Sequence, residues 1–186
     1  MKTAVFGGGC FWCTEAVFQM LKGVIKVEPG YAGGTLENPS YERVSEGNSG
    51  HAEVIQVTYD PTLITFEDLL TVFFGSHDPT TPNRQGNDVG LQYRSVIFYD
   101  SDADRVVAEK VIKEVNESLT DLPAQAGGTR VVTQLVPLEK FYPAESYHKD
   151  YYTKNSSASY CQLIIEPKLE KVRKRFAELV NPQIVS

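Results

Sequence analysis

The sequence has 186 residues, of which 41% are hydrophobic and 23% are charged, and its formal net charge is −6. This length fits one domain over residues 1–186, with a core that buries most of its apolar surface. The acidic balance gives no electrostatic reason to expect nucleic acid or an anionic membrane as a partner. With no apolar run of membrane-spanning length and no signal-peptide pattern, we expect a cytoplasmic protein without a membrane partner.

Strands and helices alternate along the predicted chain. In chain order, we expect a strand at 3–6, a helix at 11–21, strands at 24–34 and 53–60, a helix at 66–74, a strand at 94–100, a helix at 102–119, a strand at 130–136 and a basic helix after 167. A long polar loop is predicted at 76–93. This order fits an α+β fold, a ferredoxin-like two-layer sandwich with helices on one face of a mixed sheet and an irregular C-terminal segment.

Two of the three cysteines, Cys10 and Cys13, lie where the glycines at 7–9 lead into the first predicted helix. A thiol at a helix N-terminus meets the positive end of the helix dipole, which lowers its pKa and favours a nucleophilic thiolate. The C-x-x-C spacing is that of a redox pair, and it also suits a metal site. The alternative is that Cys10 is a small buried hydrophobe and the glycines only form a turn.

Glu53 stands at the head of the predicted strand at 53–60. Strand alternation places its side chain on the same face as Ile55 and Val57. If that face is the core side, burial raises the pKa of the carboxyl group and keeps it as an acid near neutral pH. If the strand end frays into water, Glu53 is an ordinary solvated glutamate.

Five segments carry a resemblance to a known family: "GGGCFWCTEAVF", "GYAGG", "NPSYERVSEGNSGHAEVIQVTYDP", "HDPTTPNRQGNDVGLQYRSVIFY" and "YCQLIIEPKLEK". In this order they resemble the A-type peptide methionine sulfoxide reductases, from about residue 3 to residue 176. The resemblance implies reduction of methionine-S-sulfoxide, protein-bound or free, for the repair of oxidised proteins. It also implies thioredoxin as the reductant and no cofactor or metal.

The resemblance implies a role for each matching residue. Cys10 is the nucleophile that attacks the sulfoxide sulfur, and Glu53 is the proton donor. The hydroxyl groups of Tyr41 and Tyr93 assist at the sulfoxide oxygen, where preorganised donors stabilise the developing charge. The substrate-binding residues it implies are Phe11, Trp12, His51 and Asp88.

The second thiol has two candidates. Attack leaves Cys10 as a sulfenic acid, which a second thiol converts into a disulfide that an external reductant reopens. By similarity Cys161 matches the usual resolving cysteine, and it is the preferred candidate. The family most often has glycine at the position of Cys13, so this chain departs from the pattern there, and Cys13 is the alternative.

Two competing functions use the same cysteines. A strand leading into C-x-x-C and a helix is the signature of a thioredoxin-like oxidoreductase, although three glycines directly before Cys10 speak against it. A zinc-binding module would use Cys10 and Cys13 with histidines. The histidine candidates for that module are His51 and either His77 or His148.

Overall fold

The computed structural model describes residues 1–120 and 130–182. Its main sheet has the strand order β7-β6-β1-β3-β2-β8, with β6 and β7 parallel and the other neighbours antiparallel. The strands are β1 (Lys2–Gly8), β2 (Val24–Ala32), β3 (Ala52–Tyr59), β6 (Ser95–Tyr99), β7 (Gln134–Pro137) and β8 (Phe141–Pro143). The mixed sheet and its helices confirm the predicted α+β class.

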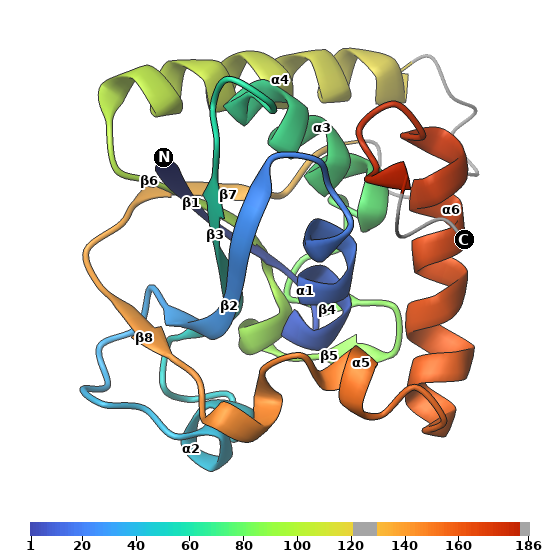
Figure 1. Ribbon diagram of the computed structural model, residues 1–186. Helices are drawn as coiled ribbons and strands as arrows, with labels where there is room; N and C mark the ends of the chain where they lie inside the picture. The colour runs from blue at the N-terminus through green and yellow to red at the C-terminus, as the bar shows by residue number, and fades with distance from the viewer. Residues whose placement is uncertain (121–129, 183–186) are drawn as a thin grey trace.

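Helices cover one face of the sheet (Figure 1). They are α1 (Phe11–Gln19), α3 (Phe66–Ser76), α4 (Asp102–Thr120) and α6 (Glu166–Arg175), while the short α2 (Tyr41–Ser45) and α5 (Tyr151–Lys154) lie in connecting segments. The main core joins these helices to alternate strand residues such as Phe6 and Ile55. A smaller cluster covers the opposite face, where Val5 and Val54 pack against the segment around Leu138.

The two predicted capping pairs begin α3 and α4. The Thr65 side chain accepts from the Asp68 backbone N–H, and the Asp68 carboxylate accepts from the Thr65 backbone N–H, a complete capping box. At α4 the Ser101 hydroxyl accepts from the Asp104 N–H at 3.1 Å. These bonds satisfy N–H groups that the first turn of a helix leaves without partners.

The predicted strand at 130–136 is shorter in the structure and occupies Gln134–Pro137. The preceding backbone bonds elsewhere: the Val131 N–H donates to the Asn116 side chain, and the Val132 N–H donates to the Pro79 carbonyl. Because these N–H groups already have partners, they cannot form the hydrogen bonds that would extend β7 along β6.

The polar loop and the C-terminal segment contain short elements of their own. The loop holds the hairpin of β4 (Arg84–Gln85) and β5 (Asp88–Val89) and the 3-10 helix η1 (Leu91–Tyr93). The C-terminal segment holds β8, the 3-10 helix η2 (Ser146–His148), α5 and the π-helix η3 (Cys161–Ile165). Figure 1 shows this segment passing below α1 before α6 rises along the neighbouring edge. Within the described ranges, no helix has both the length and the apolarity needed to span a membrane.

Candidate active site

Cys10 is the N-cap residue of α1, directly after β1. Its carbonyl accepts from the N–H groups of Cys13 at 3.2 Å and Thr14 at 3.3 Å. The turn requires glycine at position 9, because Gly9 has a φ of +96° and an added Cβ would lie 2.7 Å from Gln85. The sequence therefore places the thiol at the positive end of a helix, as predicted. The expected lowering of the pKa of Cys10 is wrong, because the hydrogen bond with Cys13 and burial raise it instead.

The thiols of Cys10 and Cys13 form a coupled pair. A hydrogen bond from Cys10 lowers the pKa of Cys13 to about 6, against the opposing effect of burial. The same bond, together with burial and the charge of Glu53, raises the pKa of Cys10 above its ordinary value. Groups coupled in this way titrate as a pair, so the first proton leaves easily and the second with difficulty. At neutral pH the two sulfurs therefore share one proton.

Two further residues surround Cys13. The Tyr160 hydroxyl lies 3.6 Å from the Cys13 sulfur and donates to the Asp88 carboxylate at 3.4 Å. The positive charge of Lys168 also lowers the pKa of Cys13. These contacts favour a thiolate within the pair.

Glu53 is buried beside this pair. Its side chain is 2% exposed and shares the core face of β3 with Ile55 and Val57, as the alternation predicts. Its Oε2 accepts from the backbone N–H of Phe11 at 3.0 Å. Burial raises its pKa to about 8, although the bond from Phe11 acts in the opposite direction. The carboxyl group therefore carries a proton at neutral pH.

Tyr41 in α2 and Tyr93 in η1 lie near enough to Glu53 and Cys10 for the charges of both to act on their hydroxyls. Burial is the largest cause that raises the pKa of each hydroxyl, and the charges of Glu53 and Cys10 raise both further. The two hydroxyls therefore remain neutral and can donate hydrogen bonds close to the acid and the nucleophile.

Aromatic side chains hold the only tryptophan, Trp12, in place. Its indole stacks on Tyr151 with ring centroids 3.7 Å apart and an interplanar angle of 6°. Its Nε1–H donates to Nδ1 of His148 at 3.1 Å. Because Nδ1 accepts, the neutral imidazole carries its proton on Nε2, which is buried and has no hydrogen-bond partner among the described residues. Phe11, beside Trp12, is almost fully buried in the core.

The structure places His51 in a loop contact. Its Nδ1 accepts from the Gly34 N–H at 3.1 Å, and its Nε2 lies 2.8 Å from the Leu36 carbonyl. His77 is engaged likewise, by the Phe73 carbonyl and the Ser95 hydroxyl. Both ring nitrogens of each histidine are thus occupied, which gives His51 no free donor for a substrate and removes both from a zinc site. In the described part of the chain, no group of three or more His, Cys, Asp or Glu side chains could hold a metal ion.

Cys161, the third cysteine, is fully buried at the start of η3. Burial, followed by the charge of Cys13, raises the pKa of its thiol. All three cysteines are free thiols. Of the three cysteines, Cys10 and Cys13 line a cavity at this end of the molecule, and Cys161 does not. The cavity wall also includes Asp88, Tyr160 and Lys168.

Sequence reasoning missed the roles of several C-terminal residues at this site, namely Tyr151, Tyr160, Lys168 and His148 as a partner of Trp12. Their contacts join residues 136 and 147 positions apart, as in Trp12–His148 and Cys13–Tyr160. The concentration of tyrosines at 141–160 was the one available signal, since buried tyrosine hydroxyls need polar partners.

Comparisons with known proteins identify the family of this chain. The family model described as peptide methionine sulfoxide reductase matches residues 2–180. A peptide methionine sulfoxide reductase MsrA from Sulfolobus acidocaldarius is 52% identical, over 99% of this chain and 100% of the relative. The crystal structure of Mxr1 from Saccharomyces cerevisiae in reduced form matches with a TM-score of 0.78 and 36% identity, over 86% of this chain and 88% of that one. Mxr1 in complex with Trx2 matches with a TM-score of 0.55 and 27% identity, over 81% and 84% of the two chains. The chain therefore belongs to the peptide methionine sulfoxide reductase family.

Proposed function

We propose that this chain reduces methionine-S-sulfoxide, protein-bound or free, to methionine by attack of Cys10 on the sulfoxide sulfur. One observation carries the proposal: the hydrogen bond from the Phe11 N–H to Glu53, which holds a buried acid next to the residue that carries the nucleophile. A sulfoxide oxygen leaves only when it is protonated, so this chemistry needs an acid and a thiolate at one place.

Glu53 supplies the proton. With Oε2 bound to the Phe11 N–H, the other carboxyl oxygen is left to donate to the sulfoxide oxygen. The raised pKa keeps this proton in place at neutral pH. The hydroxyls of Tyr41 and Tyr93 donate to the same oxygen and stabilise the charge that develops on it.

The coupled thiols supply the nucleophile. In the resting pair the thiolate lies on Cys13, which accepts a hydrogen bond from Cys10. As Cys10 attacks, its proton passes to the sulfur of Cys13, so Cys10 reacts as a thiolate without losing a proton to water. The sulfur of Cys10 bonds to the sulfoxide sulfur as the oxygen takes the proton from Glu53. The hydroxyl group then passes to the sulfur of Cys10, and the bonds from the methionine sulfur to oxygen and to Cys10 break. Methionine is released, Cys10 is left as a sulfenic acid, and two electrons have passed from the thiolate to the sulfoxide. The half-buried ring of Trp12 offers an apolar wall for the S-methyl group of the substrate.

Cys13 is the proposed resolving thiol, in place of the preferred sequence candidate Cys161. Cys13 lies in the first turn of α1, three residues after Cys10, and lines the same cavity. This proximity supports Cys13, since a thiol and a sulfenic acid must meet to form a disulfide and release water. Complete burial in η3 argues against Cys161 as the first partner. Cys161 remains the alternative if η3 rearranges after oxidation.

Thioredoxin is the proposed reductant of this disulfide. The structural match to Mxr1 in complex with Trx2 supports it. A dithiol protein would restore both cysteines and become oxidised to its own disulfide.

The experiment is to incubate the protein with methionine-S-sulfoxide or methionine-R-sulfoxide and to measure methionine, with and without thioredoxin, thioredoxin reductase and NADPH. We expect catalytic turnover with the S epimer only, and only when reductant is present. Equal reduction of both epimers would contradict the assigned stereochemistry. Disulfide exchange without any sulfoxide reduction would favour a thioredoxin-like oxidoreductase.

A further inference from the structure

A cavity of about 430 Å³ opens beside the two thiols. Its walls come from the 85–88 loop between β4 and β5 on one side and from Tyr160, Ile164 and Lys168 on the other. Cys10 is 9% exposed and Cys13 only 2% exposed. This opening therefore gives a reductant a path to a disulfide between them.

Large exposed apolar side chains lie on the two segments that supply the cavity walls. Leu163 is 72% exposed, and Ile164, which lines the cavity, is 41% exposed. Val89 follows Asp88, which lines the cavity, and is also exposed. The π-helix η3 explains the exposure of Leu163 and Ile164. It turns Cys161 and Ile165 into the core and leaves Leu163 and Ile164, which lie between them in the sequence, facing solvent.

Such side chains do not stabilise the folded chain, since each leaves its apolar surface in water. Around a cavity that ends at a redox-active pair, they are the features of a protein-binding surface: apolar contacts at the centre and a charged group, Lys168, beside them.

We propose that Val89, Leu163 and Ile164, on the two segments that supply the cavity walls, form the docking surface for thioredoxin. This inference rests on the proposed function and deepens it. Thiol–disulfide exchange needs the attacking sulfur, the attacked sulfur and the leaving sulfur nearly in line, so a protein reductant must cover the rim of the opening through which it attacks. We refer to these three residues as the rim surface.

The exchange at the rim surface passes two electrons from thioredoxin to the Cys10–Cys13 disulfide. A thiolate of thioredoxin attacks one sulfur of the Cys10–Cys13 disulfide, forms a mixed disulfide with it and releases the other sulfur as a thiolate. The second thiol of thioredoxin then attacks the mixed disulfide. Thioredoxin leaves with an intramolecular disulfide of its own, and Cys10 and Cys13 are both reduced again. The positive charge of Lys168 stabilises the thiolate at Cys13.

The test compares Leu163→Asp with Leu63→Asp. Leu63 is exposed to a similar extent, 67%, but lies in the turn after β3, near the end where Tyr59 pairs with Lys2. A second matched pair is Ile164→Asp with Ile25→Asp, since Ile25 is also exposed and lies at the start of β2. For each variant, methionine formation is measured with thioredoxin, its reductase and NADPH, and again with dithiothreitol.

We expect Leu163→Asp and Ile164→Asp to raise the KM for thioredoxin about tenfold each, because central apolar contacts contribute most to an interface. Their activity with dithiothreitol should stay within about twofold of wild type, since a small dithiol needs no docking surface. Leu163→Met, which keeps the apolar contact, should retain the wild-type KM for thioredoxin. Leu63→Asp and Ile25→Asp should behave as wild type.

An unchanged KM for thioredoxin in both rim variants would overturn the docking surface. Equal increases in the rim variants and in their controls would overturn it as well, because the effect would then come from charge alone. Failure of the proposed function looks different: the wild-type protein would then form no methionine with dithiothreitol.

Discussion

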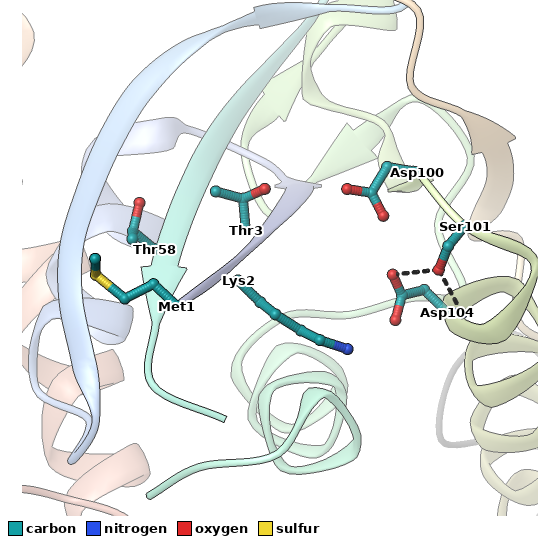
Figure 2. A pocket seen from close by; sticks show the side chains of 7 residues that line it. All are labelled: Met1, Lys2, Thr3, Thr58, Asp100, Ser101 and Asp104. Atoms are coloured by element: carbon teal, nitrogen blue, oxygen red, sulfur yellow. Dashed lines mark hydrogen bonds between the residues drawn. The ribbon is translucent and has the colours of Figure 1, made fainter. Parts of the chain in front are cut away.

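The two ends of strand β1 each carry a cavity of about 430 Å³ with carboxyl groups nearby, yet they differ in chemistry. At the start of β1, Lys2 extends toward Asp104, which is hydrogen-bonded to Ser101 (Figure 2). Asp100 completes this wall and is exposed. At the other end, β1 leads into Cys10 and the buried carboxyl group of Glu53.

The difference shows that burial, and not cavity volume, creates the reactive end. At the start of β1, Asp100 is exposed and the carboxyl group of Asp104 accepts from the Ser101 hydroxyl, so these groups serve the surface and the start of α4. Glu53 has lost its water to the core, and its single backbone donor offsets only part of that loss. The proton that it keeps is what a sulfoxide oxygen requires.

The largest expected effect is that of Cys10→Ser. An alcohol is a poor nucleophile toward sulfoxide sulfur, so we expect no detectable methionine, with an unchanged circular dichroism spectrum. Asp104→Asn, at the opposite end of β1, is the control and should leave turnover intact. Activity of the Cys10 variant within about tenfold of wild type would exclude Cys10 as the nucleophile.

Cys13→Ser should complete one round and then stop. We expect about one methionine per enzyme and an accumulating Cys10 sulfenic acid, because the proposed resolving thiol of Cys13 is absent. Cys161→Ser should continue to cycle with thioredoxin. Peptide mapping after one equivalent of sulfoxide, with thiols blocked at once, identifies the first disulfide. A Cys10–Cys161 disulfide and a stalled Cys161 variant would restore the assignment that the family resemblance implies.

Glu53→Gln should slow the sulfoxide step by about 10²–10⁴-fold, because an amide donates a hydrogen bond but cannot give up a proton. The matched control is Asp100→Asn, the same change of acid to amide in an exposed carboxyl group. Single-turnover kinetics measure the step directly. Equal rates for Glu53→Gln and wild type would remove Glu53 from the mechanism.

Wild type and Glu53→Gln should also differ in how the rate of the sulfoxide step depends on pH. Below its pKa of about 8 Glu53 holds the proton that it donates, so the rate of the sulfoxide step should fall as the pH rises through about 8. The coupled thiols lose their first proton near pH 6, so the rate should fall again below that pH. Glu53→Gln should lose the alkaline limb and keep the acidic one. An alkaline limb that persists in Glu53→Gln would show that another group is titrating.

His148→Phe should have a smaller effect. It keeps an aromatic ring beside Trp12 but removes the acceptor of the indole N–H, a bond with a net contribution of about 0.5–1.5 kcal/mol. We expect the KM for the sulfoxide to rise about two- to tenfold with kcat nearly unchanged. Because Trp12 is the only tryptophan, its fluorescence emission reports whether the indole has moved. His148→Gln, which still offers an acceptor, should restore both values.

The smallest effect on activity belongs to the other end of β1. Ser101→Ala removes the side-chain cap of α4 and should lower the free energy of unfolding by about 1 kcal/mol. Turnover should not change, since this end lacks reactive sulfur. Urea denaturation measures the first value and the coupled thioredoxin assay the second. A loss of turnover without a loss of stability would connect the two ends of β1 and contradict their separation.

The sequence by itself determined the local features of the site. Alternation along residues 53–60 placed Glu53 on the same face as Ile55 and Val57, and the glycines before Cys10 placed a thiol at the start of a helix. These features depend on the periodicity of a strand and on the start of a helix, which involve neighbours only a few residues apart.

Only the tertiary structure decided which groups meet. The bond between Phe11 and Glu53 spans 42 positions, and the bond between Trp12 and His148 spans 136. The proposed choice of the second thiol depends on tertiary structure in the same way: Cys13 lines one cavity with Cys10, while η3 buries Cys161 in the core. Local patterns cannot encode such pairs, because they form only when the whole sheet and its covering helices exclude water. That exclusion also sets the pKa of Glu53, which no reading of the residues around it in sequence could supply.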